Sequence, residues 1–281
     1  HVEFLADLGG GRFVAVWWED SDTVIPATGT DIAAAIFGVE GDLIVGPFQA
    51  NVTQSGSGEE TPRVAALPDG GFVVAYKAGE AIFADIFDAD GAHLDGFAVQ
   101  PDDGGGTLGD PEIAVRSDGS FLVSYQRDDA TSDKTDVFGR IVQANGTVGT
   151  EFTVYSAQND APSVFGAAPL SNDTFVVTFI DQDGPDFGSD PDPRFAIIDG
   201  SGAAVVDGLI SDSKSPDTSP KVAALADGGF AVAWEGFFEG TVLARIYDED
   251  GNPVSAVSRV DTPPGGDLEE PLVVALGDGG F

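Results

Sequence analysis

The chain has 281 residues, 42% of them hydrophobic, with 48 Asp and Glu against 12 Lys and Arg and a formal net charge of −36. Such a surface repels phosphate backbones, which excludes sequence-neutral binding to DNA or RNA. The 20 Phe exclude a disordered acidic tail. No apolar run reaches the length of about 18 residues that a membrane-spanning helix needs. Because the chain has no Cys, disulfides and thiolate metal sites are also excluded.

A repeat organises the chain. Five segments begin with Pro, continue through an apolar run and a small turn, and end on Phe. They cover residues 62–72, 111–121, 162–175, 220–230 and 271–281, and residues 3–13 keep the same spacing without the Pro. Successive copies are spaced by about 50 residues, which is typical of the blades of a β-propeller.

Each repeat predicts four strands, which we name A to D in chain order. Strand A precedes an Asp-Gly-Gly type of turn, because Asp and Gly tolerate the backbone angles of a tight hairpin. Strand B follows that turn, strand C follows a longer loop, and strand D follows a second turn. The predicted B strands are 13–17, 72–76, 121–125, 175–179 and 230–234. The predicted C strands are 32–37, 81–87, 137–142, 194–198 and 242–247.

The predicted fold class is therefore all-β: a single β-propeller over residues 1–281, built from four-stranded antiparallel blades, with five complete repeats and the start of a sixth. The predicted blades are approximately 2–60, 61–110, 111–161, 162–219 and 220–270, with a partial blade at 271–281. Stacked sandwich domains are the alternative, but a sandwich needs about 100 residues per unit. Because the chain lacks a starting Met and stops within a repeat, we expect a fragment of a longer protein.

The B–C and D–A loops lie on one rim of such blades. Binding sites usually sit on variable loops over a rigid scaffold, and the acidic residues of this chain concentrate in these loops. In the first B–C loop we predict a ligand-binding site at Trp18, Glu19 and Asp20, with Trp18 as a platform on which a sugar ring stacks.

The B–C loop of the fourth repeat is the predicted metal site. Alternating Asp and Gly let several carboxylates converge on Ca²⁺, which takes about six to eight oxygen ligands. The predicted ligands are Asp181, Asp183, Asp186, Asp190 and Asp192, and the alternative is a solvated acidic loop. The Asp-x-Asp-Gly segments at 88–91 and 248–251 are instead predicted to be hairpin turns, in which the Asp side chain bonds the backbone.

Most enzyme chemistries lack their residues in this sequence. His1 and His93 are its two His, there is no Gly-x-Ser-x-Gly motif, and no paired His or Cys is present for zinc. Carboxylate pairs remain, because propeller glycosidases use inner acids, and Glu3 and Glu112 are the candidates on the A strands. In so acidic a chain, acids at such positions are expected by chance and are weak evidence for catalysis. The sequence therefore predicts that the protein is not an enzyme.

The repeat phrase Pro-x-Val-Ala-Ala-Leu-x-Asp-Gly-Gly-Phe, followed by Ala-Arg-Ile-Tyr-Asp-x-Asp-Gly, resembles repeats of large secreted bacterial proteins of the hemolysin-type calcium-binding or adhesin-like class, which are exported by type I secretion. The resemblance covers essentially the whole chain. It implies a secreted protein at the bacterial cell surface, calcium dependence of the parent protein, and further domains in the parent chain. The Gly-Gly-x-Gly-x-Asp calcium motifs of that class are missing here.

Together, these observations predict a non-enzymatic extracellular binding or adhesion module. Its B–C and D–A loop face would take a glycan or a cell-surface or matrix protein, with Ca²⁺ as a structural ion. One alternative is a structural spacer of a giant secreted protein, and a second is a propeller hydrolase that acts on polysaccharide. We expect neither nucleic acid nor an inserted membrane segment among its partners.

Overall fold

The computed structural model describes residues 4–19, 31–53, 58–104, 106–128, 134–157, 162–182, 191–211, 216–236, 241–260, 271–276 and 280–281. In this part of the chain, β1 to β20 form five four-stranded antiparallel sheets without a helix. The described residues accordingly contain no helix long and apolar enough to cross a membrane. Consecutive strands pair within every sheet, so each sheet is one blade, and the predicted all-β architecture of four-stranded blades is confirmed.

The strands follow the order A to D in every blade. Blade 1 contains β1 (Phe4–Gly9), β2 (Arg12–Glu19), β3 (Asp31–Gly38) and β4 (Leu43–Gln49), and blade 2 contains β5 (Glu59–Ala66), β6 (Phe72–Ala78), β7 (Ala81–Phe87) and β8 (His93–Gln100). Blade 3 contains β9 (Glu112–Val115), β10 (Phe121–Asp128), β11 (Thr135–Val142) and β12 (Phe152–Ser156). Blade 4 contains β13 (Ser163–Pro169), β14 (Phe175–Asp181), β15 (Asp192–Ile198) and β16 (Ala204–Leu209), and blade 5 contains β17 (Asp217–Ala224), β18 (Phe230–Gly236), β19 (Thr241–Tyr247) and β20 (Ser258–Arg259).

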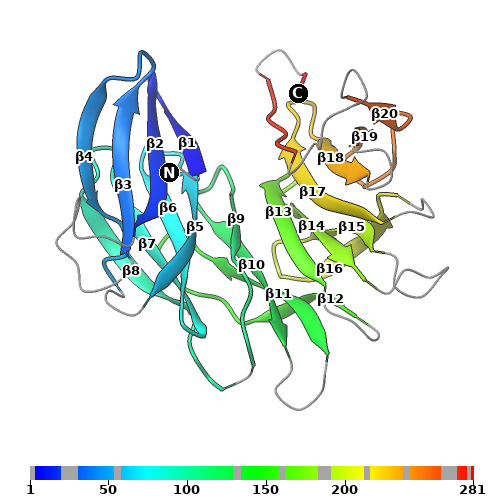
Figure 1. Ribbon diagram of the computed structural model, residues 1–281, viewed down its shortest axis with the longest axis horizontal. Helices are drawn as coiled ribbons and strands as arrows, with labels where there is room; N and C mark the ends of the chain where they lie inside the picture. Colours follow the sequence, from blue (N-terminus) through cyan, green and yellow to red (C-terminus); the bar gives the residue numbers. More distant parts are fainter. Residues whose placement is uncertain are drawn as a thin grey trace. The chain divides into compact units, whose positions relative to one another are not determined.

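The chain divides into two compact units. The first holds His1–Val123 and Arg140–Thr150, and the second holds Ser124–Gly139 and Glu151–Phe281, so blade 3 contributes to both. Within the first unit, β5 packs against β1, β2 and β3 of the preceding blade and also contacts β9; Figure 1 shows β1–β4 in blue and β5–β8 in cyan. Within the second unit, β17 packs in the same way against β13, β14 and β15. The A strands therefore form the inner edge of the blades in each unit.

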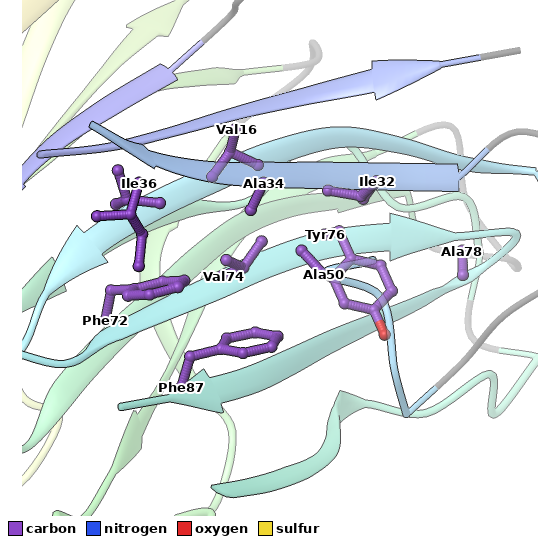
Figure 2. Packing of buried hydrophobic residues seen from close by; sticks show 11 residues of the cluster. Val16, Ile32, Ala34, Ile36, Ala50, Phe72, Val74, Tyr76, Ala78 and Phe87 are labelled. Carbon is purple, nitrogen blue, oxygen red and sulfur yellow. The ribbon is translucent and has the colours of Figure 1, made fainter. Parts of the chain in front are cut away.

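The hydrophobic core lies between neighbouring blades. In the first unit, Ile32 and Ile36 of β3 belong to one cluster with Phe72 and Tyr76 of β6 (Figure 2). The members alternate along each strand, because side chains of a strand point to opposite faces in turn. In the second unit, Trp234 of β18 belongs to the equivalent cluster between blades 4 and 5.

The B strands of blades 2 to 5 are buried on both faces, whereas β2 of blade 1 is fully buried only over Val14–Val16. Every residue of β14 is buried, and so are the first five residues of β6, β10 and β18. Strands covered on both sides read as continuous apolar runs rather than alternating ones, which explains runs such as residues 72–76. Charged side chains consequently appear only at the ends of these B strands.

A stacked pair of aromatic rings joins strands B and C at the end opposite the B–C loop. Phe72 and Phe87 are Cα partners with ring centroids 5.0 Å apart, and Figure 2 shows the two rings lying against each other. Phe230 and Tyr247 repeat the arrangement in blade 5, again at 5.0 Å. In these blades the ring on strand C favours Phe at the start of strand B, whereas in blade 4 Phe175 faces Ile198.

The predicted hairpin turns between strands C and D are confirmed. The side chain of Asp88 accepts hydrogen bonds from the backbone N–H groups of Asp90 and Ala92, and Asp248 accepts the equivalent pair from Asp250 and Asn252. The side-chain hydrogen bond from Asn252 and these backbone bonds lower the pKa of Asp248. Asx-turn chemistry thus accounts for these motifs.

We expect Phe72→Ala to lower the free energy of unfolding by about 3–5 kcal/mol, because the substitution leaves a cavity in a closed inter-blade core. The matched control is Phe281→Ala. Phe281 holds the same repeat position, but its side chain is 42% exposed, so its loss should cost under about 0.5 kcal/mol. Urea unfolding of both variants checks this, and equal costs would contradict the assignment of the core.

Candidate functional site

Buried polar residues gather at one rim of the blades. Among the described residues, six buried polar side chains lie at the start of a C strand, the end of a B strand or the start of an A strand: Asp31, Thr135, Asp181, Asp192, Asp217 and Thr241. This is the rim from which the B–C and D–A loops leave. It is also the rim to which the sequence analysis assigned the ligand and metal residues.

One repeat position on the A strands carries a different side chain in each blade. It directly follows the Pro of the repeat, or Glu3 in the first copy, which lacks the Pro, and its occupants in blades 1 to 5 are Phe4, Arg63, Glu112, Ser163 and Lys221. Because the A strands form the inner edge of the blades, this position places three of these residues along the inner edge of the first unit and two along that of the second. We call them the inner row.

The inner row of the first unit is a connected charged group. Arg63 Nε donates a hydrogen bond to Glu112 Oε1 at 3.0 Å, although the two residues belong to different blades. The guanidinium carbon of Arg63 lies 4.1 Å from the centre of the Phe4 ring, a cation–π contact with blade 1. The side chains of Arg63 and Glu112 are 14% and 12% exposed, so this ion pair is largely withdrawn from water.

Backbone strain accompanies Arg63. Thr61 has a φ of 51°, although it is β-branched and precedes Pro62, and the strand pairing shifts register between Glu60 and Arg63. Blade 5 has the same backbone conformation before its Pro, with a φ of 53° at Ser219. Bulges re-aim side chains and cluster near functional sites, and strain of this kind persists only where the surroundings impose it.

The second unit contains a different combination at its inner edge. Lys221 Nζ donates a hydrogen bond to the Phe165 carbonyl oxygen at 2.9 Å and lies 5.6 Å from the centre of that residue's ring. Four residues earlier, Asp217 is buried at the start of β17 and accepts a hydrogen bond from the Ser211 hydroxyl. This edge therefore also offers a carboxylate and a cation on one inner strand.

Two of the predicted calcium ligands come together and three lie outside the described residues. Asp181 and Asp192 are Cα partners across β14 and β15, whereas Asp183, Asp186 and Asp190 fall in the part that is not described. Asp181 Oδ2 accepts a hydrogen bond from the Tyr155 hydroxyl and lies 3.9 Å from Arg194 Nη1. Calcium binding by this loop stays a prediction. Across the described residues, no group of three or more acidic or His side chains is arranged to hold a metal.

The predicted ligand residues of the first B–C loop are split in the same way. Trp18 is 43% exposed near the end of β2, as a stacking platform requires, and Glu19 ends that strand opposite Asp31. Asp20 lies outside the described residues, as does Glu3. Ligand binding here stays a prediction.

Sequence reasoning selected Glu112 but missed Arg63, its partner in space. The two residues are 49 positions apart, and their contact depends on how neighbouring A strands pack. Aligning the repeats on the Pro and listing the next residue would have found the inner row. Asp217 gave no such signal, because it precedes the repeated phrase.

Comparisons with known proteins define the fold. No family model and no curated protein matches this chain. Its structure is similar to that of the GH93 α-L-arabinofuranosidase of Fusarium graminearum, at a TM-score of 0.63 and 12% identity over 99% of this chain and 89% of that one. It is also similar to the α-L-arabinanase of Penicillium chrysogenum, at a TM-score of 0.61 and 14% identity over 99% and 86%.

A third similar structure is the Hadza microbial sialidase Hz136, at a TM-score of 0.56 and 12% identity over 83% of this chain. This chain spans 54% of the length of that sialidase. At these identities the likeness shows the fold, and the fold is the predicted β-propeller.

The predicted non-enzymatic adhesion module is wrong, and so is the prediction that the protein is not an enzyme. The similar structures are named as glycoside-cleaving enzymes: arabinofuranosidase, arabinanase and sialidase. The error has a physical reason. A repeated scaffold resembles other repeated scaffolds through its turns and core, whereas chemistry resides in the few positions where the repeats differ.

The Tyr155–Asp181 contact predicts a pH dependence. Burial, together with the hydrogen bond to Asp181, raises the pKa of Tyr155 above its ordinary value of 10.0, so the folded state holds the phenol proton more tightly than the unfolded state. Stability from this group is complete below pH 10.0 and declines as the pH rises beyond it. We expect Tyr155→Phe to make the loss of stability between pH 9 and 11 shallower, as measured by urea unfolding. Tyr247, whose pKa is also raised, is present in both proteins, so its contribution to the pH dependence is the same in each. An unchanged slope of stability against pH in Tyr155→Phe would therefore contradict the prediction.

Proposed function

We propose that this chain is a glycoside hydrolase that cleaves arabinofuranosyl linkages in a neutral polysaccharide, with Glu112 as one of its catalytic carboxylates. The observation that carries the proposal is the Phe4–Arg63–Glu112 group on the inner strands. Support for the substrate class comes from the printed names of the similar structures, which include an arabinofuranosidase and an arabinanase. A net charge of −36 disfavours a polyanionic substrate, which is why we propose a neutral one.

Arg63 gives Glu112 its chemical role in this proposal. Glycoside hydrolysis requires one carboxylic acid that protonates the leaving oxygen and one carboxylate that activates water or attacks the sugar. A hydrogen bond from a guanidinium holds a carboxylate in one orientation and favours its ionised form, which accepts hydrogen bonds. Glu112 therefore fits the base or nucleophile. Phe4 fixes the plane of the guanidinium and so fixes the carboxylate through it.

The proton donor is proposed among the exposed acids that begin the inner strands of the same unit. Glu60 lies in β5, three residues before Arg63, and Asp110 immediately precedes Pro111 and β9. The exposed Trp18 would bind a sugar ring of the substrate by stacking. A polysaccharide is too large to enter a cell, so an extracellular location accompanies this proposal.

The test is hydrolysis of arabinan, debranched arabinan and arabino-oligosaccharides by the purified chain, with reducing sugar and product size as readouts. We expect Glu112→Gln to lower kcat by about 10²–10⁴-fold, the range for loss of a general acid–base group. Glu60→Gln and Asp110→Asn separate the two candidate donors, since one of them should give a comparable loss. Glu40→Gln is the matched control, because Glu40 is exposed in the turn between β3 and β4, on the opposite rim.

Absence of hydrolysis of all three substrates by the unaltered chain would overturn the proposal. Equal activity of the Glu112→Gln and Glu40→Gln variants would overturn the role of Glu112.

Arg63→Lys tests Arg63 as a positioning residue. The change keeps a positive charge but loses the planar guanidinium that both stacks on Phe4 and donates through Nε. We expect kcat to fall, by less than in Glu112→Gln, while KM changes little, because the lost interaction orients a catalytic group rather than the substrate. A rise in KM at constant kcat would place Arg63 in substrate binding instead.

A further inference from the structure

One buried carboxylate oxygen in blade 1 lacks a partner. Asp31 begins β3 and is 2% exposed, and its Oδ1 accepts hydrogen bonds from the side-chain amides of Gln49 at 2.9 Å and Asn51 at 3.1 Å. Its Oδ2 is buried and accepts no hydrogen bond from the described residues. Buried polar atoms in folded proteins almost always have a partner, so this oxygen requires an explanation.

The surroundings of Asp31 do not supply a positive charge. Asn51 Oδ1 accepts the backbone N–H of Ile32 at 3.0 Å, which fixes the orientation of that amide and directs its NH₂ group to Asp31. Glu19 ends β2 as the Cα partner of Asp31. Acidic residues directly opposite each other on paired strands repel, and within the described residues Asp31 forms no ion pair with Lys, Arg or His.

We propose that Asp31 Oδ2 and the Glu19 carboxylate bind one hard divalent cation, Ca²⁺ or Mg²⁺. Two carboxylates neutralise the charge of such an ion, and oxygen ligands are those that both ions prefer. Water completes the coordination sphere, as is usual for Mg²⁺ bound by one or two carboxylates. The ion satisfies the unpartnered oxygen and turns the repulsion between the two acids into an attraction to a shared charge.

The position of this site suggests what it does. Glu19 and Asp31 are the strand residues on either side of the first B–C loop, so a shared cation ties the base of that loop. Trp18, whose aromatic side chain is exposed, directly precedes Glu19. Cation binding would thereby hold the strand end that carries Trp18. This proposal is independent of hydrolase activity, because it concerns binding to the folded chain alone.

The experiment is calorimetric titration and thermal unfolding of the full chain, freed of metal by a chelator that is then removed, at constant ionic strength and pH. CaCl₂ and MgCl₂ are added separately. We expect saturable binding of one of them, with a rise in Tm of about 5 °C or more at a hundredfold excess over the dissociation constant. Asp31→Asn should abolish this response, and Glu19→Gln should weaken the affinity at least tenfold while preserving the fold.

Asp217→Asn is the matched control, because Asp217, like Asp31, is a buried acid at the start of a strand on this rim and belongs to no predicted metal site. It should leave the response intact. Loss of the response in Asp217→Asn with retention in Asp31→Asn would overturn the proposal. An equal rise in Tm with NaCl, or no response to either divalent cation, would overturn it as well.

Discussion

The coverage of the B strands on both faces is the constraint on which the rest of this structure depends. A strand with a neighbouring blade on each side has no solvent face, so its centre must be buried throughout, as it is along β14. The one polar side chain in the centre of β14, that of Thr178, donates a hydrogen bond to the Pro220 carbonyl oxygen. On the B strands, charged side chains are then confined to the strand ends, and Glu19 and Asp181 of the B–C rim occupy such ends. The inner row lies on the A strands instead, so the packing that stabilises the blades limits where chemistry can occur.

The parts of the fold that depend on local chemistry could be predicted from the sequence. The Phe that begins strand B, the Gly of the tight turns and the Asp that accepts backbone N–H groups act within a few residues of their own positions. The repetition of these signals made the period visible, and from it followed the four-stranded blades. The predicted strand at 32–37 is Ala-rich, yet its place in the repeat predicts a strand, and β3 confirms it.

The candidate site depends on contacts between blades, which the period does not report. Arg63 and Glu112 are separated by 49 residues and meet because β5 and β9 lie side by side. Asp31 and Asp181 look alike in the sequence as acids beside a B–C loop. They differ in the structure because Asp181 bonds Tyr155 of another blade, whereas Asp31 bonds two amides of its own blade and leaves one oxygen unpartnered. Such differences arise from tertiary neighbours and leave no local signal.

The contrast between the scaffold and the inner row indicates how a repeated chain acquires chemistry. Residues that pack the core between blades must be similar in every blade, because each blade packs in the same way. Phe72 and Phe230 accordingly occupy equivalent environments. The position after the Pro has different partners in the two units, Glu112 for Arg63 and the Phe165 carbonyl for Lys221, and each blade carries a different residue there. An aromatic ring, a guanidinium and a carboxylate then meet at one edge of the first unit. In such a chain the departures from the repeat, rather than the repeat itself, carry the information about function.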